Sequence, residues 1–142
     1  MYDVIFVCTG NTCRSPMAEA IAKNLMPSLS FTSMGVAAIN GSPASKNACM
    51  AMEDMGLSLA CHKSKIIDRE LLTNAKLVLT MTRSHLTIVK SFCKEANVFT
   101  LGEYAGEDKD ILDPFGGDLE TYQDCAKEIE SLIFVCAEKF VD

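Results

Sequence analysis

The fold is decided by the stretch Val4-Ile5-Phe6-Val7-Cys8-Thr9-Gly10-Asn11-Thr12-Cys13-Arg14-Ser15-Pro16. Its apolar start, residues 4–7, predicts a buried strand. Ser15 followed by Pro16 predicts the beginning of a helix, with the serine as N-cap and the proline at the first helical position. Residues 8–14, here named the cysteine loop, therefore connect a strand to the N-terminus of a helix. Open α/β sheets bind ligands at such places, and free backbone N–H groups there attract anions.

The cysteine loop carries a thiol at its first position, Cys8, and a guanidinium at its last, Arg14. A thiolate is a strong nucleophile, and a helix N-terminus and a nearby cation both favour the thiolate form of a cysteine. Backbone N–H groups and an arginine hold phosphate oxygens by charge-assisted hydrogen bonds. The combination predicts chemistry on a phosphate, whereas either residue alone is more typical of a buried strand cysteine or a surface arginine.

The rest of the chain alternates apolar strands with amphipathic helices. Apolar or alternating runs predict strands that end near Gly35, Met81 and Leu101. Helical spacing with start and stop residues predicts helices over five segments: Pro16 to Pro27, Ser42-Pro43 to Gly56, residues 66–72, Thr82 to Cys93, and residues 119–140. Strands alternating with helices indicate a parallel sheet covered on both faces. Right-handed crossovers then bring the cysteine loop, residues 82–85 and residues 102–117 to one edge of this sheet.

Length and composition are those of a single globular domain, which we assign to residues 1–142. The chain is 49% hydrophobic, and 19 acidic against 13 basic residues give a net charge of −6. A nucleic acid or an anionic membrane would require a basic face, so neither is an expected partner. Asp3 lies near the start, and residues 4–7 are too short for a signal peptide core or a membrane span. We therefore expect a cytoplasmic protein.

The seven cysteines are an odd number, and no Cys-x2-Cys pair or histidine cluster has the spacing of a zinc site. We expect reduced thiols, no metal and no cofactor. The two histidines, His62 and His85, are interpreted as surface or packing residues, although a place near the ligand site stays open for His85 because it follows the third strand. Five cysteines are interpreted as inert buried thiols: Cys49, Cys61, Cys93, Cys125 and Cys136.

The pattern Cys-x5-Arg-Ser after an N-terminal strand, with the later pair Asp113-Pro114, resembles the low-molecular-weight protein tyrosine phosphatase family. The resemblance extends from Val4 to about Phe140, and its most specific part is Val7-Cys8-Thr9-Gly10-Asn11-Thr12-Cys13-Arg14-Ser15-Pro16-Met17-Ala18-Glu19. It implies one doubly wound α/β domain with a four-stranded parallel sheet in the order 2-1-3-4 and helices on both faces. It also implies phosphorylated proteins as substrates, and we expect a monomer.

The resemblance implies a role for each residue of the cysteine loop. Cys8 would attack phosphorus and form a cysteinyl-phosphate, while Arg14 would bind the equatorial oxygens. Ser15 would place its hydroxyl on the thiolate, beside its role as a cap. Asn11 would brace the loop with its side chain and would also tolerate a left-handed turn. Backbone N–H groups would come from the four remaining residues: Thr9, Gly10, Thr12 and Cys13.

Two further roles follow from the resemblance. Asp113 would be the general acid that protonates the leaving group and then activates water, with Pro114 stiffening the backbone after it. The simpler interpretation of Asp113 is a solvated loop carboxylate. A reversible disulfide between Cys8 and Cys13 is also implied, and the alternative for Cys13 is a residue packed beneath the turn.

Within the family, Thr12 and the segment Asp113-Pro114-Phe115-Gly116-Gly117 are most similar to the bacterial protein-arginine phosphatases. Tyrosine-directed members usually carry a bulky aliphatic residue in place of Thr12 and often have adjacent tyrosines after the Asp-Pro pair. We predict a phospho-arginine substrate, with Asp113 accepting guanidinium N–H groups and Phe115 forming a wall for the flat group. The alternative is a tyrosine phosphatase in which Thr12 is a neutral variation.

Three other functions are less consistent with the sequence. An arsenate reductase on this scaffold requires further redox cysteines after the third strand, and residues 79–82 contain none. A phosphocarrier that holds phosphate on a similar cysteine has no use for Arg14 or for a hydrolytic acid such as Asp113. A non-catalytic phosphoprotein-binding module would lack Cys8.

Overall fold

The structure is a computed structural model that describes residues 1–141, so the last residue of the predicted domain, Asp142, lies outside the described residues. The elements follow in the order β1 (Val4–Cys8), α1 (Arg14–Leu25), β2 (Phe31–Gly35), α2 (Lys46–Asp54), α3 (Arg69–Asn74), β3 (Leu77–Thr80), α4 (Arg83–Phe92), β4 (Val98–Thr100), α5 (Leu101–Tyr104), α6 (Leu119–Cys136) and the 3-10 helix η1 (Ala137–Val141). Strands alternate with helices as the sequence predicts.

The four strands form one sheet in the order β2-β1-β3-β4, and all of its neighbours are parallel. β1 is an interior strand, since Val4 pairs with Phe31 on one side and with Leu77 on the other. The predicted fold class and strand order are therefore confirmed. Because the strands are parallel, the segments that follow β1, β3 and β4 all leave the sheet at its carboxyl edge.

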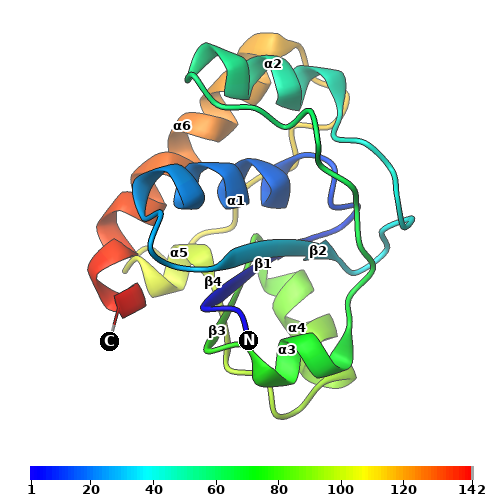
Figure 1. Ribbon diagram of the computed structural model, residues 1–142, viewed down its shortest axis with the longest axis vertical. Coiled ribbons are helices and arrows are strands. Elements are labelled where there is room, and N and C mark those ends of the chain that lie inside the picture. The colour runs from blue at the N-terminus through cyan, green and yellow to red at the C-terminus, as the bar shows by residue number, and fades with distance from the viewer. Residues whose placement is uncertain (142) are drawn as a thin grey trace.

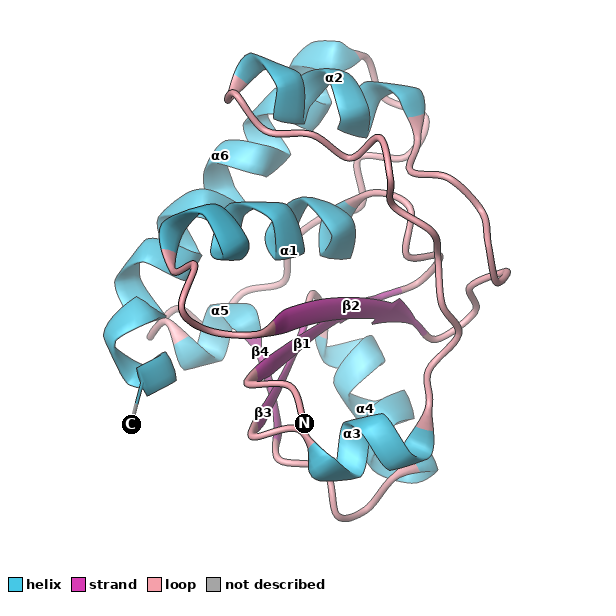
Figure 2. Cartoon of the chain, in the orientation of Figure 1, coloured by secondary structure: helices cyan, strands magenta, loops and turns pink. Residues whose placement is uncertain are grey.

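Helices cover both faces of the sheet, with α1, α2 and α6 on one side and α3 and α4 on the other (Figure 1, Figure 2). The alternation of side chains along β1 matches these two layers. Val4 and Phe6 belong to the core under α1 and α6, whereas Ile5 and Val7 belong to the core under α3 and α4. A strand buried on both faces reads as a continuous apolar run, which is the pattern of residues 4–7.

Two predicted helix starts are wrong. Ser15 is not an N-cap, because α1 begins at Arg14 and Cys13 occupies the cap position without a side-chain cap bond. The hydroxyl of Ser15 is engaged inside the cysteine loop instead. The cap of α2 is Ser45, whose hydroxyl accepts the N–H of Ala48, and not Ser42. A Ser-Pro pair is an ambiguous signal, since the residue before a proline favours extended backbone as well.

Three other boundaries differ from their predictions. β4 ends at Thr100, because the capping box between Thr100 and Glu103 starts the short helix α5 at the next residue. The short helix predicted over residues 66–72 lies at Arg69–Asn74, where the Asp68 carboxylate caps it. The final helix stops at Cys136, and the chain continues to Val141 as a 3-10 helix.

Two predicted helix signals are confirmed. Thr82 caps α4 through a bond from the His85 N–H, and Gly56 follows α2 with a φ of +78°, a conformation that favours glycine. Within residues 1–141, no helix combines the length and the apolar character that crossing a bilayer requires.

Candidate active site

Several backbone N–H groups of the cysteine loop make no hydrogen bond within the described part of the chain. Among residues 1–141, nothing accepts a hydrogen bond from the N–H groups of the four residues Gly10, Asn11, Thr12 and Cys13. Asn11 has a φ of +57°, the left-handed conformation that asparagine tolerates. The loop runs directly into the N-terminus of α1, which adds a partial positive charge. Loop and helix together form a concave group of donors suited to an anion.

Cys8 lies at the base of this loop and is buried. Its Sγ is 2.9 Å from the hydroxyl oxygen of Ser15. That oxygen already accepts a hydrogen bond from Nδ2 of Asn11 at 2.8 Å. The hydroxyl hydrogen is therefore available to donate to the sulfur, since the other acceptor, the Met34 carbonyl, is farther away at 3.4 Å. A donated hydrogen bond stabilises a thiolate relative to a thiol.

Asn11 is fully buried and makes the bonds that fix the loop. Its Nδ2 also donates to the Ser33 hydroxyl, and its Oδ1 accepts the Lys65 N–H. Its carbonyl oxygen accepts from the Ser64 hydroxyl at 2.8 Å and contacts Nε2 of His62 at 2.7 Å. The interpretation of His62 as a surface or packing residue therefore missed a polar contact with the loop. No local sequence signal marks these partners, because they lie on β2 and on the segment after α2.

Gly35, the last residue of β2, allows the cysteine loop to approach the sheet closely. A Cβ at this position would lie 2.5 Å from the Thr9 carbonyl oxygen and 2.8 Å from the Asn11 nitrogen. The backbone that follows is bonded to the loop, since the N–H groups of Val36 and Ala37 donate to the carbonyls of Cys8 and Thr9. Glycine is the side chain that fits such an approach without displacing backbone.

Arg14 connects the cysteine loop to the segment that carries Asp113. Its side chain is only 4% exposed, and Nη1 donates to the Ile111 carbonyl at 2.9 Å. Nη2 lies 3.6 Å from Oδ2 of Asp113. The Asp113 side chain is half exposed, and its Oδ1 accepts the Phe115 N–H at 3.0 Å across Pro114. The carboxylate is thus held beside the guanidinium while it remains open to solvent.

A cavity of about 270 Å³ joins these groups. Eight of the predicted site residues line it: Cys8, Thr9, Gly10, Thr12, Cys13, Arg14, Asp113 and Phe115. The remaining two, Asn11 and Ser15, are fully buried and hydrogen-bonded to each other, and Ser15 also contacts Cys8. The nucleophilic thiol, the guanidinium and the carboxylate therefore share one small space. Within the described residues, no group of three or more potential ligands is placed to hold a metal ion.

Residues 3–139 match the family described as low molecular weight phosphotyrosine protein phosphatase. The chain belongs to this family. A protein-arginine-phosphatase of Geobacillus stearothermophilus is 43% identical over 97% of this chain and 95% of its own length. The low molecular weight protein-tyrosine-phosphatase PtpB of Staphylococcus epidermidis is 39% identical over 92% of this chain and 93% of its own length.

The solved structure of a YwlE arginine phosphatase mutant with a phosphorylated active-site serine superposes with a TM-score of 0.93. It is 38% identical, and the match covers 98% of this chain and 95% of that one. The predicted family, the phosphatase class and a cysteine-based mechanism are confirmed by these relationships. This member of the family is a hydrolase that acts on phosphoproteins.

His85 supports the phosphatase site from α4. The ring is 4% exposed, with Nε2 2.8 Å from the Thr9 hydroxyl oxygen and Nδ1 3.0 Å from that of Thr82. Burial, together with the positive charge of Arg14, lowers the pKa of His85 to about 4, so the ring is neutral at pH 7. His85 therefore lies next to the candidate ligand site, a position that the sequence left open.

The other cysteines divide into two groups. Burial raises the pKa of Cys125 to about 12 and that of Cys136 to about 11, which makes both thiols poor nucleophiles, as expected for inert buried cysteines. The prediction of burial is wrong for Cys61, which is exposed, and for Cys49, which is partly exposed. Cys61 lies in a turn between α2 and α3.

Cys13 is buried beneath the loop, as its packing interpretation predicts. Its Sγ lies 3.3 Å from the Ser45 hydroxyl and 3.5 Å from the Tyr122 hydroxyl. Burial and the neighbouring Cys13 raise the pKa of Tyr122 to about 12. Cys8 and Cys13 are both free thiols, so the disulfide implied by the resemblance stays a prediction.

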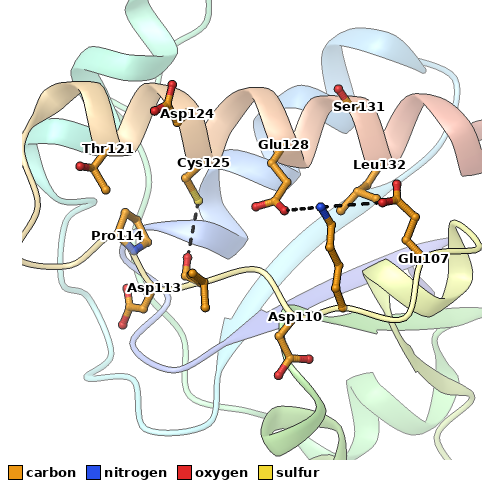
Figure 3. Close-up of a pocket in the computed structure, with 12 residues that line it drawn as sticks. Glu107, Asp110, Asp113, Pro114, Thr121, Asp124, Cys125, Glu128, Ser131 and Leu132 are labelled. Carbon is orange, nitrogen blue, oxygen red and sulfur yellow. Dashed lines mark hydrogen bonds and ion pairs between the residues drawn. The ribbon is translucent and has the colours of Figure 1, made fainter.

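A second, larger cavity of about 760 Å³ adjoins the phosphatase site at Asp113 and Pro114 (Figure 3). Its far wall is α6, from which Asp124 and Glu128 project, while Glu107 and Asp110 come from the segment before Asp113. Lys109 forms ion pairs with Glu128 at 3.2 Å and with Glu107 at 3.7 Å. The cavity beside Asp113 is therefore lined by more carboxylates than cations.

Proposed function

We propose that this chain hydrolyses protein phospho-arginine through a cysteinyl-phosphate intermediate. The observation that carries the proposal is the 270 Å³ cavity, which Thr12 and Phe115 line together with the thiol, the guanidinium and the carboxylate. Cys8, Arg14 and Asp113 are the proposed catalytic residues. The proposal is further supported by the 43% identity to a protein-arginine-phosphatase over nearly the whole chain.

In the first step, the Cys8 thiolate attacks phosphorus and the phosphorus–nitrogen bond to the substrate guanidine breaks. Backbone N–H groups of the cysteine loop and the Arg14 guanidinium hold the three equatorial oxygens as charge develops on them. Asp113 donates a proton to the departing nitrogen. The products of this step are the free arginine side chain and a phosphorylated Cys8.

In the second step, the Asp113 carboxylate accepts a proton from water, and the water oxygen attacks the cysteinyl-phosphate. The sulfur–phosphorus bond breaks, inorganic phosphate leaves, and the thiolate of Cys8 is restored. The bond from Ser15 to Sγ, at 2.9 Å, stabilises this leaving thiolate. The phosphorylated active-site serine in the YwlE mutant is consistent with phosphate transfer to the residue at this place in that enzyme.

Phospho-arginine depends on the acid more than phospho-tyrosine does, because a guanidine that departs without a proton is a much poorer leaving group than a phenolate. The preference for phospho-arginine is attributed to Thr12. Thr12 leaves room that a bulky aliphatic side chain would fill, although size alone discriminates by only about 1–3 kcal/mol. A hydrogen bond from a guanidinium N–H group to the Asp113 carboxyl oxygen that carries no proton would add to this preference.

The proposal is tested by phosphate release from matched phospho-arginine and phospho-tyrosine peptides, with the Cys8→Ser variant as the blank. We expect release to be faster from phospho-arginine and absent in the blank. Thr12→Ile should then lower kcat/KM for phospho-arginine more than for phospho-tyrosine. Preference for phospho-tyrosine in the unaltered protein would contradict the proposed substrate and favour the tyrosine phosphatase alternative.

We also propose that the protein acts as a cytoplasmic monomer without a nucleic-acid or membrane partner. The net charge of −6 supports the absence of these two partners, because anionic polymers and membranes repel an acidic protein. Sedimentation at the concentration used for the phosphatase assay tests the monomer directly.

A further inference from the structure

We propose that His85 is a positioning residue that orients the Thr9 hydroxyl, so that Thr9 donates a hydrogen bond to the phosphoryl group in addition to its backbone N–H. This inference rests on the proposed phosphatase function but not on the choice between phospho-arginine and phospho-tyrosine. Thr9 would be a phosphate-binding side chain in the active site, and His85 would act through it from a different layer of the fold.

The geometry of the contact points to this role. Thr9 is the residue after Cys8; it is exposed and lines the 270 Å³ cavity. His85 lies 76 residues later, in the first turn of α4, and is almost completely buried. Its Nε2 contacts the Thr9 hydroxyl oxygen at 2.8 Å. A buried ring is thus in contact with a hydroxyl on the wall of the cavity.

The hydrogen bonds around the ring favour one tautomer. The Thr82 hydroxyl oxygen accepts the backbone N–H of His85 at 3.2 Å and lies 3.0 Å from Nδ1. If the Thr82 hydroxyl donates its hydrogen to Nδ1, the neutral ring carries its own hydrogen on Nε2. Nε2–H then donates to the Thr9 oxygen, and the Thr9 hydrogen is left for an acceptor in the cavity. In this arrangement the Thr82 hydroxyl, His85 Nε2 and the Thr9 hydroxyl each donate one hydrogen bond.

The charge of the site is compatible with a neutral ring. Burial and Arg14 disfavour the imidazolium, and the opposing effects of Asp110 and Asp113 are smaller. A neutral histidine in the stated tautomer donates through Nε2 without adding a second cation beside Arg14. The ring therefore orients the Thr9 hydroxyl, while Arg14 supplies the positive charge that binds phosphate.

A double-mutant cycle of Thr9→Val, His85→Leu and the double variant tests the inference. The measured quantities are kcat/KM for the preferred phosphopeptide and the dissociation constant of inorganic phosphate, each per active site counted by alkylation of Cys8. A hydrogen bond to a charged group is worth about tenfold in affinity, so each single variant should lose about tenfold in both quantities. Because His85 acts through Thr9, the loss in the double variant should not exceed the larger of the losses in the two single variants.

Conservative variants separate orientation from packing. Thr9→Ser keeps the hydroxyl, and His85→Gln keeps an amide N–H near the position of Nε2, so both should retain most of the phosphate affinity. Ile88→Ala, on the exposed side of the same helix, is the matched control and should leave affinity unchanged. A purely structural role of His85 would lower the melting temperature and the count of active sites, but the effects of the two substitutions would then add.

Two results would overturn the inference: unchanged phosphate affinity in Thr9→Val, or additive losses in the double variant. Phosphate binding is measured without turnover. It therefore tests the roles of Thr9 and His85 in binding phosphate even if the unaltered protein released no phosphate from either peptide. That last result would contradict the proposed function instead. The two failures are therefore distinguishable.

Discussion

The two loops that face the catalytic cavity are held in opposite ways. The cysteine loop is anchored from behind, where Asn11 and Ser15 are buried and bonded to β2 and to the segment after α2. The loop that carries Asp113, residues 107–117, is largely exposed, with Leu112 at 81% and Phe115 at 79%. Its backbone is held at the buried Ile111, whose N–H donates to the Met81 carbonyl and whose carbonyl accepts from Arg14.

The difference separates two tasks of the site. Phosphate is the same in every substrate, and its oxygens need donors that are already in place when charge develops, which requires a rigid loop. In the proposed reaction the leaving group is larger than phosphate, and the protein around it varies from one substrate to the next, so an exposed loop next to the cavity suits its recognition. Substitutions in the first loop should therefore alter stability and phosphate affinity together, whereas those in the second should alter catalysis with little change in stability.

Asp113→Asn should give the largest effect on turnover. General acids contribute roughly 10²- to 10⁴-fold, so we expect a loss of that size in kcat for phospho-arginine. An aryl phosphate with an acidic phenol needs little protonation and should lose far less. The free energy of unfolding should change by less than about 0.5 kcal/mol, because the carboxylate is half exposed.

The measurement compares kcat for the two substrates in the unaltered and the variant protein, and phosphate binding is the control. Equal losses on both substrates would contradict the assignment of Asp113 as the acid. A large loss of stability would contradict the division of tasks between the two loops.

Substitutions of Asn11 test whether its buried hydrogen bonds hold the cysteine loop in place. Asn11→Gly tolerates the φ of +57° but loses the side-chain bonds to Ser15, Ser33 and the Lys65 N–H. We expect it to lower the free energy of unfolding by about 2–3 kcal/mol, because buried partners are left unsatisfied. Asn11→Ala should lose about 1 kcal/mol more, since a Cβ is strained in the left-handed region.

Urea unfolding of the two variants measures both quantities, and phosphate affinity should fall in parallel. Equal stability of the glycine and alanine variants would show that backbone strain contributes nothing here. Unchanged stability in both would show that the bonds behind the loop do not hold it.

The same contrast explains what the sequence could and could not predict. The strand, the loop and Arg14 are contiguous, so the sequence could place Cys8 and Arg14 at one site, and the Asp-Pro pair singled out Asp113, which lines the same cavity. The partners of Asn11 could not be found in this way, because Ser33, His62 and Ser64 are far apart in sequence and converge only when β2 and the following segments fold against the loop.

The errors have a similar origin. A serine before a proline predicts a helix cap only if its hydroxyl is free, and tertiary contacts with Cys8 and Asn11 use the hydroxyl of Ser15. The exposure of Cys61 depends on which elements cover its turn, and apolar periodicity carries no information on this. The parallel sheet was predictable because strands alternate with helices along the chain, whereas the strand order was implied by the resemblance to the phosphatase family.

The pH dependence of stability gives a further test of the rigid side. The folded pKa of His85, about 4, lies below the value of 6.5 for an unperturbed histidine. The unfolded chain therefore binds a proton that the folded chain does not, and His85 lowers stability as the pH falls from about 6.5 toward 4. His85→Gln should remove this part of the slope while the carboxylate contribution of the rest of the protein remains.

Urea unfolding between pH 4 and pH 8 in both proteins measures the difference between the two slopes. An identical slope would show that the ring is not held neutral in the folded protein.

Phe115→Ala should have the smallest effect and tests the exposed side alone. A cation over an exposed aromatic ring is worth about 0.5–1 kcal/mol, so KM for a phospho-arginine peptide should rise about two- to fivefold. Phe115→Tyr keeps a ring at the same place and should restore most of the affinity. The affinity for inorganic phosphate and the free energy of unfolding should stay unchanged, because the side chain is 79% exposed. A parallel loss of phosphate affinity would mean that Phe115 shapes the cysteine loop, and the two loops would then no longer divide phosphate binding from leaving-group recognition.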